Sequence, residues 1–340
     1  MIESKAQNGI GWITLNRPEA LNALSLAMIR DMTQLLKTWE TDPSITTVLI
    51  QGAGGKAFCA GGDVRAVYEA QKAGDVATCD TFFREEYTLN TFIHSSPKPY
   101  VALIDGLALG GGLGVSVNGS HRIVSERALL AMPETGIGFF PDVGGTTFLT
   151  RGPSPVGLYV GLTGTPLKAR DALWFGLATH FVRSSNLPSL KAELEHGGEL
   201  ESLLSHYTQD PEEKGLLETH REPIEAHFKK ASLREIFEGL AEDPSPFAQN
   251  TLNILKTKSP TSLAVTFRQL RRPPRSFVEG IKQEFRLSQR MVMNHDFREG
   301  IRAVLVDKDR LPRWKPLRIE ELTEQDIDAF FAPLERELIL

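Results

Sequence analysis

Apolar residues along the first half of the chain alternate between the two-residue spacing of strands and the wider spacing of helices. Short apolar runs that end at glycine, proline or asparagine predict strands at residues 9–15, 46–51, 99–104, 121–125 and 129–131. Helical spacing predicts helices at residues 23–40, 63–73 and 81–94, the opening of a helix within 111–118, and another helix after Asp142. Strands that alternate with helices predict an α/β core in which helices pack on sheets.

The pattern changes after about residue 182. From there to the end, segments rich in Leu, Glu, Lys and Arg are punctuated by prolines such as Pro246, Pro260 and Pro273. We therefore expect this half to be helical, with helices broken at the prolines. Residues 187–215 show the weakest periodicity, and we expect them to hold a linker or a mobile loop.

The composition is typical of a soluble globular protein. Of the 340 residues 41% are hydrophobic and 24% charged, and the net charge of -5 argues against nucleic-acid binding. No apolar run is long enough to predict a membrane span. The first residues resemble neither a secretory signal nor a transit peptide, so we expect a cytoplasmic protein, or a mitochondrial-matrix protein if the sequence is a mature eukaryotic form. The only cysteines, Cys59 and Cys79, favour a reducing compartment, and no metal-ligand spacing is present.

Two carboxylates lie in unusual surroundings. The stretch AMPETGIGFFPDVGG, residues 131–145, sets Glu134 and Asp142 among glycines, prolines and apolar side chains. Burial in such surroundings raises the pKa of a carboxyl group, because desolvation disfavours its charged form. Two such acids, eight residues apart and joined by a turn, are expected to converge on one small ligand, as in an acid–base site.

Two glycine-rich segments, residues 52–63 and 106–114, offer backbone N–H groups. The first is not a phosphate-binding loop, because Ile50 and Ala57 stand where that motif needs Gly and Ser or Thr. No G-x-G-x-x-G follows a strand either, so a Rossmann nucleotide site is not expected. The first segment is either a surface turn or a loop whose Gly61 and Gly62 point N–H groups at a ligand oxygen. The second is either a close helix–strand contact or an anion hole at a helix start.

Other candidate groups are weaker. Ser116 lacks the glycine two residues later that a nucleophile elbow needs, and Cys59 has no histidine partner nearby. The histidines are scattered and form no metal motif. In FFREEY, residues 82–87, the two acids form either a solvated helix face or part of a site.

These segments, in this order, resemble the crotonase (enoyl-CoA hydratase/isomerase) superfamily. The resemblance covers about residues 5–182 and rests on the strand–loop–helix at 56–63, the run Gly110-Gly111-Gly112, and Pro133-Glu134. The segments FFREEY, KPYVALIDG, LGGGLGVSV and AMPETGIGFFPDVGG are further similar to the 3-hydroxyisobutyryl-CoA hydrolases of that superfamily. The resemblance implies a crotonase-like superhelix of ββα units over residues 1–185 and a helical C-terminal extension over residues 186–340.

The resemblance also implies roles for individual residues. The backbone N–H groups of Gly62 and Gly111 would form an oxyanion hole around a thioester carbonyl. Glu134 falls at the superfamily's catalytic glutamate and Asp142 at the second acid of the hydrolases, while Glu86 matches a substrate-contacting glutamate. Hydratases carry another glutamate where this chain has Gly114, which makes addition of water to an enoyl double bond doubtful.

The expected function is therefore hydrolysis of 3-hydroxyisobutyryl-CoA, or a close 3-hydroxyacyl-CoA, in valine catabolism. Glu134 would either attack the carbonyl carbon or deprotonate a water, while Asp142 and Glu86 would bind the substrate hydroxyl. Arg17, Lys56 and Arg65 are candidate phosphate neighbours for CoA. No metal or redox cofactor, nucleic acid or membrane is expected as a partner, and a homo-oligomer is left open. The alternatives are an enoyl-CoA hydratase or isomerase, and a non-catalytic subunit of a larger assembly.

Overall fold

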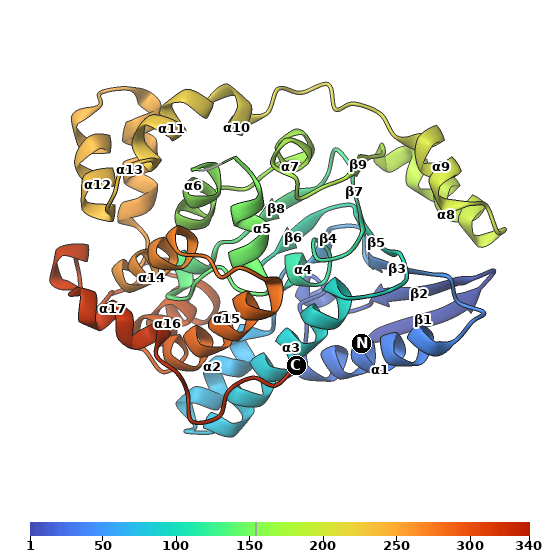
Figure 1. The fold of residues 1–340 in the computed structure, drawn as a ribbon, viewed down its shortest axis with the longest axis horizontal. Helices are drawn as coiled ribbons and strands as arrows, with labels where there is room; N and C mark the ends of the chain where they lie inside the picture. Colours follow the sequence, from blue (N-terminus) through green and yellow to red (C-terminus); the bar gives the residue numbers. More distant parts are fainter. Residues whose placement is uncertain (154) are drawn as a thin grey trace. The chain divides into compact units, whose positions relative to one another are not determined.

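The chain folds into two compact units. The structure is a computed structural model that describes residues 1–153 and 155–340. We call the first the sheet unit, which comprises Met1–Asp63, Thr88–Ala131 and Pro166–Glu218. We call the second the helical unit, which comprises Val64–Tyr87, Met132–Thr165 and Thr219–Leu340. Helices α3, Val76–His94, and α10, Leu216–Thr219, contribute to both (Figure 1).

All described strands belong to the sheet unit. They are β1 Ile2–Gln7, β2 Ile10–Leu15, β3 Thr47–Gly52, β4 Ala57–Cys59, β5 Tyr100–Ile104, β6 Leu107–Leu109, β7 His121–Val124, β8 Leu129–Ala131 and β9 His180–Phe181. One sheet has the order β1-β2-β3-β5-β7-β9, and only its β1–β2 pair is antiparallel. The other sheet has the parallel order β4-β6-β8.

Successive strands are divided between the two sheets. In each of the pairs β3/β4, β5/β6 and β7/β8, the first strand joins the larger sheet and the second joins the smaller one. The chain turns sharply at Gly106, between β5 and β6, where φ is +141° and an added Cβ would lie 2.6 Å from the Lys56 carbonyl oxygen. Only glycine fits this corner without strain. The repeated strand pair is the ββα arrangement that the resemblance implies.

The larger sheet is covered on one face by two helices, α8 Leu187–Glu195 and α9 Leu200–Tyr207. Leu190, Leu194 and Leu204 of these helices pack in one buried cluster with strand residues that include Trp12 and Val101. The expectation of a linker across residues 187–215 is therefore wrong for its first two thirds. Residues 208–215 alone connect α9 to α10 without a helix or strand (Figure 1).

The remaining helices of the sheet unit are short apart from α1. They are η1 Pro18–Ala20, α1 Leu26–Thr41, α4 Gly111–Gly114, α7 Ala169–Phe175 and η3 Ser184–Asn186. The helix predicted to open within residues 111–118 ends after one turn, at Gly114. Glycine is a poor helix former, and the Asn118 side chain donates a 2.9 Å hydrogen bond to the Gly114 carbonyl, which offers that carbonyl a partner outside the helical ladder.

Helices make up the regular structure of the helical unit. They are α2 Val64–Lys72, η2 Glu134–Ile137, α5 Gly145–Arg151, α6 Val156–Thr163, α11 Arg221–Phe228, α12 Leu233–Glu242, α13 Pro246–Lys256, α14 Pro260–Arg271, α15 Phe277–Met291, α16 His295–Ile301, η4 Arg302–Val306, η5 Ile319–Glu321 and α17 Glu324–Phe331. Pro246 and Pro260 begin helices, directly after the capping serines Ser245 and Ser259. Proline suits this position because its missing N–H needs no partner there.

The α/β class and the helical C-terminal region are confirmed. Every described element after β9 is a helix, whereas the predicted boundary between residues 185 and 186 stays a prediction. Strands β1, β6 and β9 were not predicted, and two of them are only two or three residues long, whereas β4 lies in the strand–loop–helix at 56–63 that the resemblance uses. None of the helices in the described residues is both long and apolar enough to cross a membrane.

Candidate active site

One cluster of buried carboxyl groups in the helical unit has four members, and three of them are the predicted site acids. Their exposed fractions are 2% for Glu86, 7% for Glu134, 5% for Asp142 and 0% for Glu284. They come from α3, from the 3-10 turn η2, from the loop before α5, and from α15. Electrostatic interactions link each of the predicted acids to another member of this group, so the fold brings Glu86, Glu134 and Asp142 together.

The backbone around Glu134 is held from two sides. The Thr135 hydroxyl donates a 3.1 Å hydrogen bond to the Leu162 carbonyl at the end of α6. The Thr135 carbonyl in turn accepts a 3.1 Å hydrogen bond from the Ser259 N–H, just before α14. These two hydrogen bonds hold Thr135, the residue after Glu134, and so fix the backbone from which the Glu134 side chain extends.

Asp142 is held by a tyrosine. The Tyr87 hydroxyl donates a 2.8 Å hydrogen bond to Asp142 Oδ2, and both groups are buried. The Tyr87 ring meets Phe83 and Phe285 edge-on, with centroid separations of 5.8 and 6.4 Å. FFREEY therefore supplies a packed aromatic face, and its Glu86 belongs to the buried cluster rather than to a solvated face.

The loop that carries Asp142 is clamped by two buried side chains. The Glu284 carboxylate accepts hydrogen bonds of 2.8 Å from the N–H groups of Gly144 and Thr146. The Gln269 side-chain amide donates to the Pro141 carbonyl at 2.8 Å and to the Thr146 hydroxyl at 2.7 Å. Helices α14 and α15 thus fix the loop on both sides of Asp142.

Burial shifts the acid–base behaviour of all four carboxyl groups. Burial, followed by the charge of Asp142, raises the pKa of Glu86 and that of Glu134 well above the usual glutamate value. Burial raises the pKa of Asp142 to about 7, although the Tyr87 hydrogen bond favours its charged form. Burial likewise raises the pKa of Glu284 to about 8. Near neutral pH the cluster therefore holds protons, and its members cannot all be charged.

Two oxygen atoms in this cluster are left without partners. Glu86 Oε1 and Glu134 Oε2 are buried and have no hydrogen-bond partner among the described residues. Unpaired buried polar atoms are costly and concentrate where a ligand supplies the missing partner. The arrangement suits proton transfer or nucleophilic attack at a bound molecule.

The glycines predicted to form an oxyanion hole lie in the sheet unit. At Gly61 φ is +110°, and an added Cβ would lie 3.1 Å from the Leu109 carbonyl oxygen and 3.7 Å from the Gly111 nitrogen. The Gly61–Gly62 turn therefore lies directly beside the start of α4. Neither the Gly62 nor the Gly111 N–H donates a backbone hydrogen bond within the described residues. Both donors are thus available, and their role in catalysis stays a prediction.

One of the candidate phosphate ligands, Arg17, already has a charged partner. Arg17 forms a 2.7 Å ion pair with Asp63 in the sheet unit, so its charge is already partnered.

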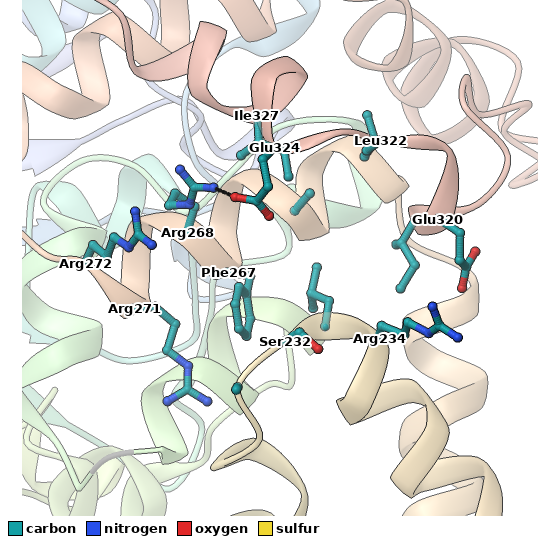
Figure 2. Close-up of a pocket in the computed structure, with 14 residues that line it drawn as sticks. Ser232, Arg234, Phe267, Arg268, Arg271, Arg272, Glu320, Leu322, Glu324 and Ile327 are labelled. Carbon is teal, nitrogen blue, oxygen red and sulfur yellow. Dashed lines mark hydrogen bonds and ion pairs between the residues drawn. The ribbon is translucent and has the colours of Figure 1, made fainter.

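A separate cavity of about 500 Å³ lies in the helical unit and is lined by Arg234, Arg268 and Arg271 together with Phe267 (Figure 2). Figure 2 shows Arg268 joined to Glu324, and none of the four buried carboxyl groups lines this cavity.

Sequence reasoning missed Lys258, Gln269 and Glu284. Lys258 is a partly buried cation within electrostatic reach of Glu134, and burial lowers the pKa of its ammonium group. All three residues lie more than a hundred positions after Glu134, in segments with ordinary helical patterning. No group of three or more potential metal-binding side chains occurs within residues 1–153 and 155–340.

Comparisons with known proteins agree with this architecture. The family model of enoyl-CoA hydratase/isomerase matches residues 10–331, well beyond the segment that carried the resemblance. The chain is 47% identical to the mitochondrial 3-hydroxyisobutyryl-CoA hydrolase of Rattus norvegicus, over 95% of this chain and 86% of the rat protein.

Two solved structures superpose closely on the chain. A carnitinyl-CoA dehydratase from Mycobacterium thermoresistibile is 38% identical, with a TM-score of 0.94 and coverage of 99% of this chain and 98% of the other. An enoyl-CoA hydratase from Rhodobacter sphaeroides is 37% identical, with the same TM-score and coverage of 100% and 99%. The predicted crotonase-like fold and the similarity to the hydrolases are confirmed, and the chain belongs to the enoyl-CoA hydratase/isomerase family.

Proposed function

We propose that this protein hydrolyses 3-hydroxyisobutyryl-CoA to 3-hydroxyisobutyrate and CoA, a reaction of valine catabolism. The observation that carries the proposal is the buried Glu134 carboxyl, whose Oε2 has no partner and which lies beside Asp142 and Glu86. The extent of identity to the rat hydrolase, along nearly the whole chain, supports the same substrate class.

Glu134 acts at the thioester carbonyl carbon in one of two ways. Its carboxylate attacks the carbon and expels the CoA thiolate, and water then opens the resulting anhydride. Alternatively it takes a proton from a water molecule that attacks the same carbon. Both routes need the ionised carboxylate and release one free thiol per ester cleaved.

The acyl hydroxyl is recognised by the other two acids. Asp142 accepts a hydrogen bond from it, and the unpartnered Glu86 Oε1 offers a second acceptor. A site built to bind a hydroxyl rejects substrates that lack it, because the buried acceptors are then left unpaired. The specificity for a 3-hydroxyacyl group follows from this arrangement.

The backbone N–H groups of Gly62 and Gly111 hold the oxyanion in this proposal. Both are free of backbone acceptors in the described chain, as such donors must be. Loss of one preorganised donor lowers the rate by about 10²–10³-fold in related chemistry. CoA enters as part of the substrate, and the reaction as proposed uses no metal or redox cofactor.

Hydration of an enoyl-CoA is the second candidate. Two structural neighbours are a dehydratase and a hydratase, and Asp142 and Glu86 place carboxyl groups beside Glu134 despite the glycine at position 114. Hydrolysis releases a thiol, whereas hydration removes the absorbance of the conjugated double bond without releasing one. Parallel assays with 3-hydroxyisobutyryl-CoA and crotonyl-CoA therefore separate the two reactions.

The decisive variant is Glu134→Gln, measured by thiol release over a panel of 3-hydroxyacyl-CoA esters. It should lose hydrolysis but still bind the ester, because the amide keeps the shape of the side chain. Near-normal turnover by Glu134→Gln would refute the assignment. A wild-type protein that releases no thiol and copurifies in a stable complex would instead favour a non-catalytic subunit.

The cellular location and the oligomeric state remain part of the proposal. The rat relative is a mitochondrial protein, which supports the matrix alternative over the cytoplasmic one. Cell fractionation tests the location, and sedimentation of the purified chain tests for a homo-oligomer.

A further inference from the structure

The ammonium group of Lys258 lies close to turn η2, which carries Glu134. It lies between α13 and α14, and an added Cβ on Gly136 or Gly164 would lie 3.4 or 3.7 Å from its Nζ atom. Gly136 is two residues from Glu134 within turn η2. The glycines at these two positions therefore leave room for the ammonium group beside the turn.

The position of Lys258 is fixed by its neighbours. The N–H of the next residue, Ser259, donates a 3.1 Å hydrogen bond to the Thr135 carbonyl, and Ser259 Oγ donates a 2.6 Å hydrogen bond to the buried Asp296. The Lys258 N–H itself donates to the Leu255 carbonyl at 3.0 Å. Glu134 and Lys258 are thus joined by a short and rigid path through the Thr135 peptide.

Lys258 also lines a cavity of about 800 Å³ in the helical unit. The cavity is bordered by Gly136, the buried Trp314, and the exposed charged residues Lys256, Asp309, Arg310 and Arg313. Asp309 is paired with Arg302. Lys258 forms no ion pair within 4 Å in the described chain, with Glu134 or any other acid, and Glu134 is the one charge that favours its protonated form.

We propose that Lys258 is the charge partner of Glu134 and favours the ionised form of that carboxyl in its attack on the thioester, an inference that rests on the proposed function. The charged groups that face Glu134 are Asp142, Glu86 and Lys258. The two acids disfavour a negative charge on Glu134, whereas a backbone hydrogen bond and, among the charged groups, only Lys258 favour it. Lys258 acts through Glu134 and is a positioning residue rather than a catalytic one.

The test is the pH dependence of kcat/KM for thiol release. In Lys258→Met the acid limb should move to higher pH, because the loss of a neighbouring positive charge disfavours the ionised carboxyl. The matched control is Lys256→Met, which removes an exposed cation from the same cavity and should leave the limb in place. An unmoved limb in Lys258→Met, or an equal displacement in Lys256→Met, would overturn the proposal.

Chemical rescue tests whether the positive charge at position 258 is what matters. Lys258→Cys should show the same displaced acid limb. Alkylation of the cysteine with bromoethylamine rebuilds an amine of nearly the same length and should bring the acid limb back to its wild-type pH. Cys59 and Cys79 are buried, so the introduced thiol is the accessible one. Failure of a fully alkylated sample to recover would contradict the charge role.

A second readout does not need turnover. Carbon-13 NMR of the glutamate carboxyl groups, with the Glu134 signal assigned by its loss in Glu134→Gln, follows the titration of Glu134 directly. Lys258→Met should raise the titration midpoint, and Lys256→Met should leave it unchanged. If no acyl-CoA ester is cleaved but the midpoint moves, the proposed function fails while the charge pairing stands.

Discussion

Tyr87 holds Asp142 through one 2.8 Å hydrogen bond, from its hydroxyl to Oδ2 of the carboxylate. The bond favours the charged form of Asp142, so it opposes the burial that raises the pKa of this acid to about 7. Tyr87 follows Glu86 directly on α3, so one helix delivers a carboxyl group and the support for another. Under the proposed function, recognition of the substrate hydroxyl therefore depends on a residue that does not need to touch the substrate.

The variant Tyr87→Phe should weaken this recognition. Without the hydroxyl, the pKa of Asp142 rises further and a larger fraction of it is protonated at neutral pH. A hydrogen bond to a charged group contributes about 1.5–3 kcal/mol, so we expect kcat/KM for 3-hydroxyisobutyryl-CoA to fall by at least about 10-fold. Tyr159→Phe is the matched control, since Tyr159 is a buried tyrosine of α6 whose hydroxyl accepts from Thr165. Equal losses in both variants would show that the effect is only structural.

Asp142→Asn should move the acid limb of kcat/KM to lower pH. After burial, Asp142 is the largest cause of the raised pKa of Glu134. Neutralising it lowers the pKa of Glu134, so the reactive carboxylate persists to lower pH, opposite in sign to the change expected for Lys258→Met. The measurement uses isobutyryl-CoA, which lacks the hydroxyl, so that lost recognition does not obscure the profile.

The control for this prediction is Asp171→Asn. Asp171 is a buried acid in the sheet unit that accepts a 2.8 Å hydrogen bond from the Leu217 N–H. Its neutralisation should leave the profile unmoved. An acid limb that moves to higher pH in Asp142→Asn would contradict the electrostatic coupling.

The sequence alone predicted two of the three site acids, because these two break a local rule. Glu134 and Asp142 stand among apolar residues and glycines, and the family resemblance added Glu86. Their grouping in one cluster is confirmed by the fold. The glycine clusters stood out for the same reason. A run of glycines lowers stability through lost conformational entropy, so it indicates a backbone that needs glycine.

The supporting residues carried no such signal. Glu284 and Gln269 lie in amphipathic helices where glutamate and glutamine are common, and Lys258 lies in the short connection between α13 and α14. Only tertiary packing, of α14 and α15 against the 141–146 loop and of Lys258 near turn η2, gives them a role. Likewise β4 and β6 are three residues long, too short for hydrophobic periodicity to reveal.

Gly61→Ala should lower kcat. The φ of +110° is unfavourable for alanine, and the new Cβ would lie 3.1 Å from the Leu109 carbonyl oxygen, next to the Gly111 nitrogen. Displacement of either proposed oxyanion donor should cost about 10²-fold in kcat. Gly74→Ala carries similar strain, with φ +76°, but meets nothing within 4 Å, so it should retain activity. Equal kcat in the two variants would argue against a role for this turn.

Glu284→Gln should change how stability depends on pH. The pKa of Glu284 is raised to about 8 in the folded chain, whereas a glutamate in an unfolded chain titrates near about 4.3. The folded state therefore binds this proton more tightly, and Glu284 loses stabilising free energy as pH rises from the lower value through the higher one. The glutamine variant lacks this loss, but it also gives up one of the two backbone hydrogen bonds that Glu284 accepts from Gly144 and Thr146.

The two effects have different pH dependence, which separates them. At pH 6 Glu284→Gln should melt at a lower temperature than the wild type, because the missing acceptor costs about 1–3 kcal/mol. Between pH 6 and 9 the gap should narrow, because only the wild type ionises Glu284 there. Thermal unfolding of both proteins across this range provides the measurement. If the difference in melting temperature between the two proteins stays constant from pH 6 to 9, Glu284 does not titrate in this interval. Its pKa would then not be raised as burial requires.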